Sequence, residues 1–234
     1  MGKIQSTKEP QYDALVELKK RKGLTRLGIM NNQVWNDDPK RLVFTLSRYK
    51  FVAKMLTGKE RVLEVGCGDA FCSRIVMQEV QNLTVTDFDP VFITDIKERM
   101  DPDWAMEYSE HNMLESPFPK RFDAIYSLDV LEHIHPSDED QFLANLALSL
   151  HDHGVLIIGM PSLESQTYAS EQSKIGHVNC KTGNEFRKIM GKYFHNVFIF
   201  AMNDEVVHTG FLKMAHYLIA LCTEKKNGEV ATTG

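Results

Sequence analysis

The sequence has few cysteines, no long apolar run and no excess of positive charge, and each shortage excludes a class of protein. Its 234 residues include four cysteines, which form no Cys-x-x-Cys pair and no regular spacing: positions 67, 72, 180 and 222. Isolated cysteines indicate reduced thiols rather than a disulfide framework, so we predict a cytoplasmic protein. No stretch reaches the about 18 apolar residues of a membrane-spanning helix, so we expect no membrane partner.

The charge balance is slightly acidic. Lys and Arg number 27, Asp and Glu number 32, and the formal net charge is −5. Proteins that bind a nucleic-acid backbone cluster Lys and Arg, whereas the one basic run here, residues 19–22, is typical of a solvated helix end. Nucleic acid is therefore a disfavoured partner. The 43% hydrophobic and 25% charged content fits one globular domain with a core.

A glycine turn follows the apolar run at residues 62–65. Gly66 and Gly68 carry no Cβ, so the backbone at this turn can lie close to a ligand, although glycines can also simply end a core strand. The third glycine of a nicotinamide-dinucleotide fingerprint is missing, because Phe71 stands at its position. An NAD-dependent oxidoreductase is therefore only an alternative.

Short apolar runs alternate with helical stretches from residue 61 onward, which predicts a parallel sheet with crossover helices. We expect strands at 61–66, 82–87, 104–108, 122–127, 154–160, 195–202 and 212–222, and helices at 70–80, 90–99, 137–150 and 182–192. The last two strands follow each other without a helix, so one should pair antiparallel, and residues 203–208 should form the turn before the last strand. The result is an α/β, Rossmann-like fold with a seven-stranded, mostly parallel sheet and helices on both faces.

Helical spacing dominates before residue 60. Apolar residues recur at helical intervals around residues 12–18 and again at 42–56, and the polar stretch at 34–38 should interrupt the two leading helices. We therefore expect an N-terminal helical cap at residues 1–58, a main domain at 59–223 and a flexible tail at 224–234.

Polar side chains follow the second, third and fourth predicted strands. Asp87 lies 19 residues after Gly68, where a carboxylate can accept hydrogen bonds from a ribose diol. Asn112 and Met113 follow the third strand, and Ser127 ends the fourth. Because parallel strands end at one edge of a sheet, we expect these residues to converge on one nucleoside.

This ordered series resembles the class I S-adenosylmethionine-dependent methyltransferases. The matching residues are Glu64-x-Gly66-x-Gly68, Asp87-Phe88-Asp89-Pro90, Asn112-Met113, FDAI at 122–125 and GVL at 154–156. The resemblance implies an S-adenosylmethionine site in which three groups of residues contact the methionine part, the ribose and the adenine, respectively: Glu64, Gly66, Cys67 and Gly68; Asp87; and Phe88, Asn112 and Met113. We add Ser127 to this cofactor-binding set.

Two positions depart from the family pattern. Ala70 stands where many members have a third glycine, and Asn112 stands where many have aspartate. Alanine is a mild change. Asparagine can donate as well as accept hydrogen bonds, so the adenine contact would have a different polarity.

A second resemblance lies after the fourth strand. Asp129-x-x-Glu132-His133 resembles the acid-x-x-Glu-His site of ubiquinone-biosynthesis O-methyltransferases and of small-RNA 2′-O-methyltransferases, in which a divalent cation can bind. Three interpretations stay open: a cation site, a metal-free His133 that acts as a base or contacts the substrate, and a structural turn. We expect no metal ligand.

The polar stretch at residues 161–181 has no clear period, which is typical of a loop that covers a substrate. It contains His177, and we name His133 and His177 as candidate catalytic residues. We expect methyl transfer to a small-molecule acceptor, with oxygen favoured over nitrogen because imidazoles and carboxylates crowd the site. The alternatives are a non-catalytic partner subunit that binds S-adenosylmethionine and an NAD-dependent oxidoreductase. The oligomeric state stays open, with a homodimer as one option.

Overall fold

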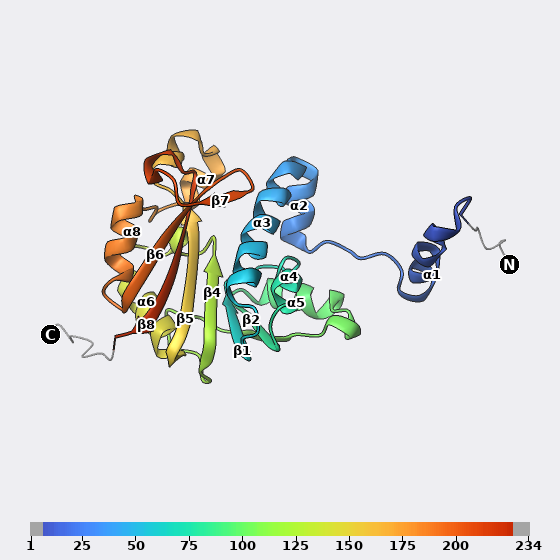
Figure 1. Ribbon diagram of the computed structural model, residues 1–234, viewed down its shortest axis with the longest axis horizontal. Helices are drawn as coiled ribbons and strands as arrows, with labels where there is room; N and C mark the ends of the chain where they lie inside the picture. The colour runs from blue at the N-terminus through green and yellow to red at the C-terminus, as the bar shows by residue number, and fades with distance from the viewer. Residues whose placement is uncertain (1–6, 227–234) are drawn as a thin grey trace.

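The computed structural model describes residues 7–226, in which helices cover both faces of one eight-stranded sheet (Figure 1). The strand order is β3-β2-β1-β4-β5-β8-β6-β7. The strands are β1 (Arg61–Val65), β2 (Asn82–Asp87), β3 (Glu107–Glu110), β4 (Phe122–Leu128), β5 (Leu150–Pro161), β6 (Phe194–Asn203), β7 (Val206–His208) and β8 (Tyr217–Lys225). The pairs from β3 to β5 are parallel, and β8 pairs antiparallel with both β5 and β6. The predicted α/β fold with a mostly parallel sheet is confirmed.

Eight α-helices are described in residues 7–226. They are α1 (Asp13–Lys22), α2 (Ile29–Asp37), α3 (Pro39–Met55), α4 (Ser73–Met77), α5 (Pro90–Arg99), α6 (Glu139–Leu148), α7 (Glu171–Gly176) and α8 (Gly183–Met190). Two hydrophobic clusters hold five of these helices to the sheet, one with side chains of α3, α4 and α5 and the other with side chains of α6 and α8. Successive strand residues point to opposite faces, so Val62 joins the first cluster and Leu63 the second.

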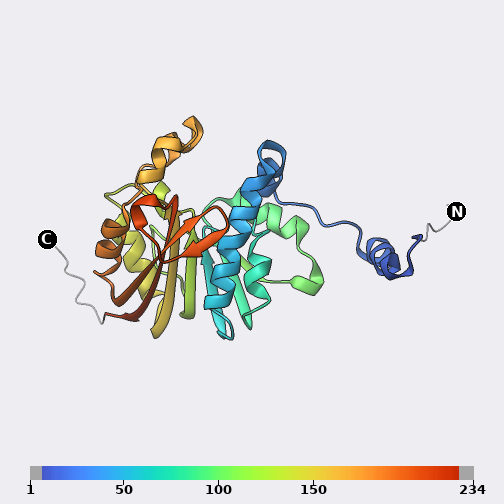
Figure 2. The same cartoon turned by 45° about the horizontal axis from the view of Figure 1, so that its top comes forward.

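The N-terminal helices differ in how they contact the rest of the chain. In both views α1 lies apart from the sheet, joined to α2 by an extended segment (Figures 1 and 2). None of its residues is buried, and Lys22 at its end pairs with Asp101 at 3.1 Å. By contrast, α3 buries Leu42, Tyr49 and Val52. Within residues 7–226, no helix is long and apolar enough to cross a membrane.

Several sequence predictions about elements are wrong in detail. The sheet has eight strands because residues 206–208, predicted as part of a turn, pair with β6 as an edge strand. Residues 34–37, predicted as an interruption, lie inside α2. The last strand begins at Tyr217, after a short 3-10 turn at Leu212–Met214, and extends to Lys225. Of the predicted tail, residues 227–234 lie outside the described part of the chain.

Candidate functional site

The glycine turn meets Asp87 at the carboxyl edge of the sheet, as the sequence predicts. Gly66 and Gly68 have φ values of 74° and 52°, a left-handed conformation that favours glycine. The Gly68 N–H donates to Asp87 Oδ2 at 2.9 Å. Asp87 ends β2 and is 6% exposed, and this burial raises the pKa of its carboxyl group. The turn and the carboxylate therefore form one unit.

Glu64 lies beneath this turn between two tyrosines. Tyr49 of α3 and Tyr126 of β4 each donate a hydroxyl hydrogen bond of 2.6 Å to its carboxylate. Glu64 is 1% exposed, and burial raises its pKa to about 7. In the described structure its carboxylate therefore links β1 to α3 and to β4. The sequence analysis missed both tyrosines, because Tyr49 looks like one more residue of an apolar helical stripe.

Three other predicted cofactor residues are also buried. The Cys67 thiol lies in the core, and burial raises its pKa. Ser127 Oγ donates to the carbonyl oxygen of Val65 at 2.9 Å, which ties β4 to β1. Met113 is 3% exposed, and its side chain belongs to the cluster beneath α6 and α8. All three side chains therefore pack inside the protein next to the carboxyl ends of the strands.

Asn112 and Phe88 lie at the surface of the same edge. The Asn112 side chain accepts from Leu114 N at 3.0 Å and donates to Glu115 at 2.9 Å, so it stabilises its own turn. Phe88 is 69% exposed, directly after Asp87. Phe88 therefore presents an apolar ring to solvent next to the Asp87 carboxylate.

Helix α2 covers the glycine turn. Asp69 accepts the backbone N–H of Asn31 at 2.8 Å and its side-chain amide at 2.7 Å, so it caps the first turn of α2. Met30 Sδ fills the place that a Cβ on Gly68 would need. The side chain of Asp69 likewise fills the place that a Cβ on Gly28 would need. These contacts, which the sequence analysis did not predict, attach α2 to the glycine turn.

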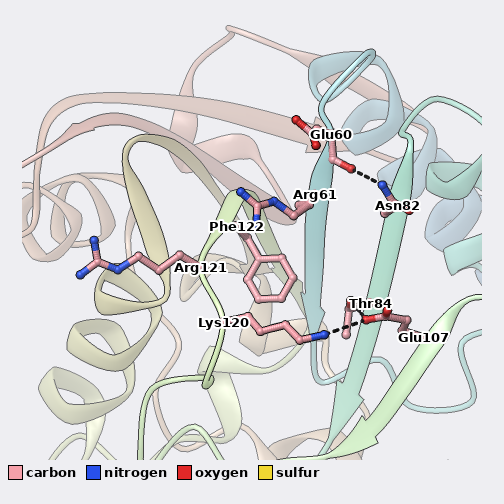
Figure 3. Close-up of a pocket in the computed structure, with 8 residues that line it drawn as sticks. All are labelled: Glu60, Arg61, Asn82, Thr84, Glu107, Lys120, Arg121 and Phe122. Carbon is pink, nitrogen blue, oxygen red and sulfur yellow. Dashed lines mark hydrogen bonds and ion pairs between the residues drawn. The ribbon is translucent and has the colours of Figure 1, made fainter.

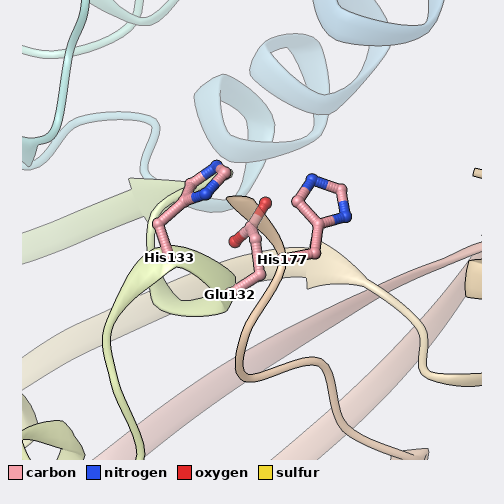
Figure 4. A group of neighbouring side chains, drawn as sticks. All are labelled: Glu132, His133 and His177. Carbon is pink, nitrogen blue, oxygen red and sulfur yellow. The ribbon is translucent and has the colours of Figure 1, made fainter. Parts of the chain in front are cut away.

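The two histidines predicted as catalytic lie together, with Glu132 beside them (Figure 4). Their ring centroids are 5.2 Å apart. His133 Nδ1 lies 2.9 Å from the carbonyl oxygen of Gly176, and His177 Nδ1 lies 2.8 Å from Gln166 Oε1. Because these oxygens accept hydrogen bonds, each Nδ1 is placed to donate, and in the neutral form of either ring Nε2 then keeps the lone pair. Burial lowers the pKa of His177, which favours its neutral form.

Glu132 joins the two histidines. Ligand atoms of Glu132, His133 and His177 lie within 4.8 Å of one another. Among the described residues, Glu132 Oε2 is a buried atom without a hydrogen-bond partner, and burial raises the pKa of this carboxyl group well above its usual value. A carboxylate with two imidazoles, each fixed through its other nitrogen, is a donor set that suits a divalent cation. The residues present therefore fit such an ion.

Asp129, the first acid of that motif, contacts α3. Arg48 Nη1 donates to both of its carboxylate oxygens, at 2.9 and 2.7 Å, and the guanidinium carbon lies 3.7 Å from the ring centroid of Tyr217. The sequence analysis missed both Arg48 and Tyr217. One signal was present: Arg48 stands four residues after Phe44 and four before Val52, on the buried side of α3.

A hollow of about 250 Å³ lies at the other edge of the sheet, beside the amino ends of the strands (Figure 3). Glu107 at its border accepts from Thr84 at 3.1 Å and pairs with Lys120 at 3.6 Å. None of the predicted site residues lines it. The candidate site is therefore the carboxyl edge, where the glycine turn, Asp87 and the histidine pair lie.

Known proteins share part of this sequence pattern and the fold. A family described as a methyltransferase domain matches residues 62–154. The structure is similar to an N-methyltransferase, NodS from Bradyrhizobium japonicum WM9, in complex with S-adenosyl-L-homocysteine (19% identity, TM-score 0.60, 81% of this chain and 90% of that chain). It is also similar to a TehB-like S-adenosylmethionine-dependent methyltransferase from Corynebacterium glutamicum (17%, 0.58, 78% and 88%) and to the CurJ carbon methyltransferase (14%, 0.61, 93% and 60%). No curated protein sequence matches the chain.

The matched region begins in β1, contains the glycine turn, Asp87 and the histidine turn after β4, and ends within β5. The similarity to solved structures, all below 25% identity, concerns the fold, and the family match concerns the domain. Residues 62–154 therefore match a methyltransferase domain, and most of the chain shares the fold of S-adenosylmethionine-dependent methyltransferases.

Proposed function

We propose that the protein transfers the methyl group of S-adenosylmethionine to a hydroxyl oxygen of a small molecule. The observation that carries this proposal is the pair of imidazoles, His133 and His177, whose rings lie together and whose Nδ1 atoms are each held by an oxygen, which leaves the Nε2 atoms for an acceptor. Relatives described as an N-methyltransferase and a carbon methyltransferase share the fold, so the fold leaves the methylated atom open. The preference for oxygen rests on the imidazoles.

The cofactor would lie across the carboxyl ends of β1 and β2. Asp87 has one carboxylate oxygen on Gly68 N and the other on Asp89 N, and the remaining lone pairs can accept from the two ribose hydroxyls. The bare backbone of the glycine turn would lie against the methionine part. Phe88, Asn112 and Met113 stay the proposed adenine contacts. When bound, the sulfonium supplies an electrophilic methyl group.

The chain's own residues would then orient the acceptor and remove its proton. Methyl transfer needs the attacking oxygen in line with the carbon–sulfur bond, so most of the acceleration comes from positioning. A hydroxyl must also lose its proton, and His133 Nε2 can accept it because its Nδ1–H is held by a backbone carbonyl. His177, held by Gln166, would orient the hydroxyl from the other side.

A divalent cation is a second candidate for the same place. The observation that favours it is the buried, unpartnered Glu132 Oε2 beside the two imidazoles. Glu132, His133 and His177 would hold the ion, and a bound cation would lower the pKa of a nearby hydroxyl. This candidate conflicts with our prediction of no metal ligand. Calorimetric titration of the purified protein with Mg²⁺, Mn²⁺ and Zn²⁺ decides between the metal-free and the metal-dependent site. If the site is metal-free, none of these ions should bind and turnover should be unchanged after EDTA treatment.

The experiment that tests the proposal is turnover of a library of phenols, alcohols and amines with labelled S-adenosylmethionine. His133→Ala and His177→Ala should each lower kcat at least tenfold, about 1.4 kcal/mol in the barrier. His111→Ala is the control, because His111 contacts Ser116 in a different turn. Wild-type rates in both active-site variants would contradict a hydroxyl acceptor. Cofactor binding without any product would favour the non-catalytic partner subunit, and binding of NAD would favour the oxidoreductase.

We further propose that residues 59–223 form the catalytic domain and residues 1–58 its cap, with residues 161–181 over the acceptor. That the protein works in the reducing cytoplasm stays a prediction. Its support is that all four cysteines, at 67, 72, 180 and 222, are free.

A further inference from the structure

Arg48 is an interior cation that neither the cofactor residues nor the histidine pair explains. Its side chain is 17% exposed, its Nη1 donates to both oxygens of Asp129, and its guanidinium carbon lies over the buried ring of Tyr217. Removing a guanidinium from water is costly unless it is paired, and here a carboxylate and an aromatic face compensate it. This pairing links α3, the turn after β4 and β8 at one point.

Asp129 is held at both its side chain and its main chain. Its φ is 57°, a left-handed conformation that costs a non-glycine residue about 1–3 kcal/mol and persists where the surroundings enforce it. The Asp129 N–H donates to Gly159 O of β5 at 2.9 Å, while Arg48 holds the carboxylate. Gly159 in turn lies against Tyr217, whose hydroxyl would be 2.6 Å from any Cβ at that position.

The turn that follows carries the acceptor side of the site. Val130 packs against Gly66 of the glycine turn, and its carbonyl oxygen accepts the N–H of His133 at 2.9 Å. The carbonyl oxygen of Glu132 accepts the N–H groups of both Val178 and Asn179, at 2.9 and 3.0 Å, directly after His177. Both histidines are thus anchored to the short stretch that begins at Asp129.

We propose that Arg48 is the positioning residue of the acceptor site: by holding Asp129 in its left-handed conformation, it fixes the turn that sets His133 against His177. The part of this inference that concerns turnover rests on the proposed function, whereas the part that concerns geometry does not. The side-chain hydrogen bonds and the ion pair described for Arg48 go to Asp129, so Arg48 acts through that residue.

Hydrogen exchange of the purified protein tests the geometry without any acceptor. Arg48→Met keeps an unbranched side chain and removes the guanidinium with its pairing, so the amides of Val178 and Asn179 and those of residues 129–134 should exchange at least tenfold faster. Arg187→Met is the matched control, because Arg187 donates to the Val197 carbonyl on the other face and should leave these amides unchanged. Equal exchange of these amides in Arg48→Met and wild type would overturn the proposal.

Two further variants guard against a trivial loss of fold. Arg48→Lys keeps a cation but not the planar stack on Tyr217, and it should show at least threefold faster exchange at the same amides with the rest of the sheet protected as in wild type. In Arg48→Ala, added ethylguanidine should restore protection and turnover, whereas ethylamine should not. Faster exchange without restoration by ethylguanidine would make Arg48 merely structural and overturn the assignment. Faster exchange with normal turnover would contradict the proposed role of the histidines rather than the role of Arg48.

Discussion

Replacing Gly66 with alanine tests the close packing between the glycine turn and the turn after β4. Gly66 has a φ of 74°, a conformation that costs an L-residue about 1–2 kcal/mol. A Cβ at this position would also overlap Cγ2 of Val130, and an extra methyl group in packed space costs about 1–3 kcal/mol. Gly66→Ala should therefore lose about 2–5 kcal/mol of unfolding free energy, a large share of the about 5–15 kcal/mol that a domain has.

Urea unfolding followed by circular dichroism measures this loss. Gly58→Ala is the matched control: Gly58 has a φ of 81° and nothing within 4 Å of its missing Cβ, so it should lose only the conformational part, about 1–2 kcal/mol. Adding Val130→Ala to Gly66→Ala should recover at least about 1 kcal/mol relative to additivity, because the clashing methyl groups are removed. Equal losses in Gly66→Ala and Gly58→Ala would refute the close approach of the two turns.

Two other predictions concern the elements around the glycine turn. Burial raises the pKa of Glu64 from its ordinary 4.5 to about 7, so the stability contributed by the protonated carboxyl is fully present below about 4.5 and is lost as pH rises through about 7. Between pH 4.5 and 8, the unfolding free energy of wild type should therefore fall by about 3 kcal/mol more than that of Glu64→Gln, as measured by urea unfolding. Parallel pH profiles of the two proteins would contradict the raised pKa of Glu64. Asn31→Ala removes a hydrogen bond of 2.7 Å to the Asp69 carboxylate, worth about 1.5–3 kcal/mol, so amides of residues 29–37 should exchange at least tenfold faster. Asn36→Ala, whose amide bonds only within α2, should not have this effect, and if it does, the capping by Asp69 is not what holds the helix.

The central half of the sheet follows from local sequence patterns. Apolar runs that end in glycine or aspartate predict β1 and β2, and the fold class predicts that Gly68 and Asp87 lie at one sheet edge; the hydrogen bond between them appears only in the structure. Helix α2 escapes such reasoning, because its polar residues bury no apolar face and its first turn is capped by Asp69, distant in sequence. The added strand β7 is three residues long, too short for a periodic pattern.

The candidate site shows the same division. His133 stands out in the sequence through the Asp129-x-x-Glu132-His133 motif and His177 through the polar stretch that contains it, but only the fold brings the two rings to 5.2 Å. Other hydrogen bonds around the candidate site also join residues that are far apart in the sequence. Arg48 bonds to Asp129, 81 positions away, and Tyr126 bonds to Glu64, 62 positions away. A single sequence carries no record of such pairs.

Calorimetric titration with S-adenosyl-L-homocysteine, comparing wild type with Asp87→Ala, tests the cofactor site most directly. Two ribose hydroxyls on one carboxylate contribute about 1.5 kcal/mol each at the least, so the variant should bind at least about 100-fold more weakly than wild type. Wild type should bind one molecule per chain. Undiminished affinity in Asp87→Ala, or no binding by wild type at saturating concentration, would contradict a cofactor held between the glycine turn and Asp87.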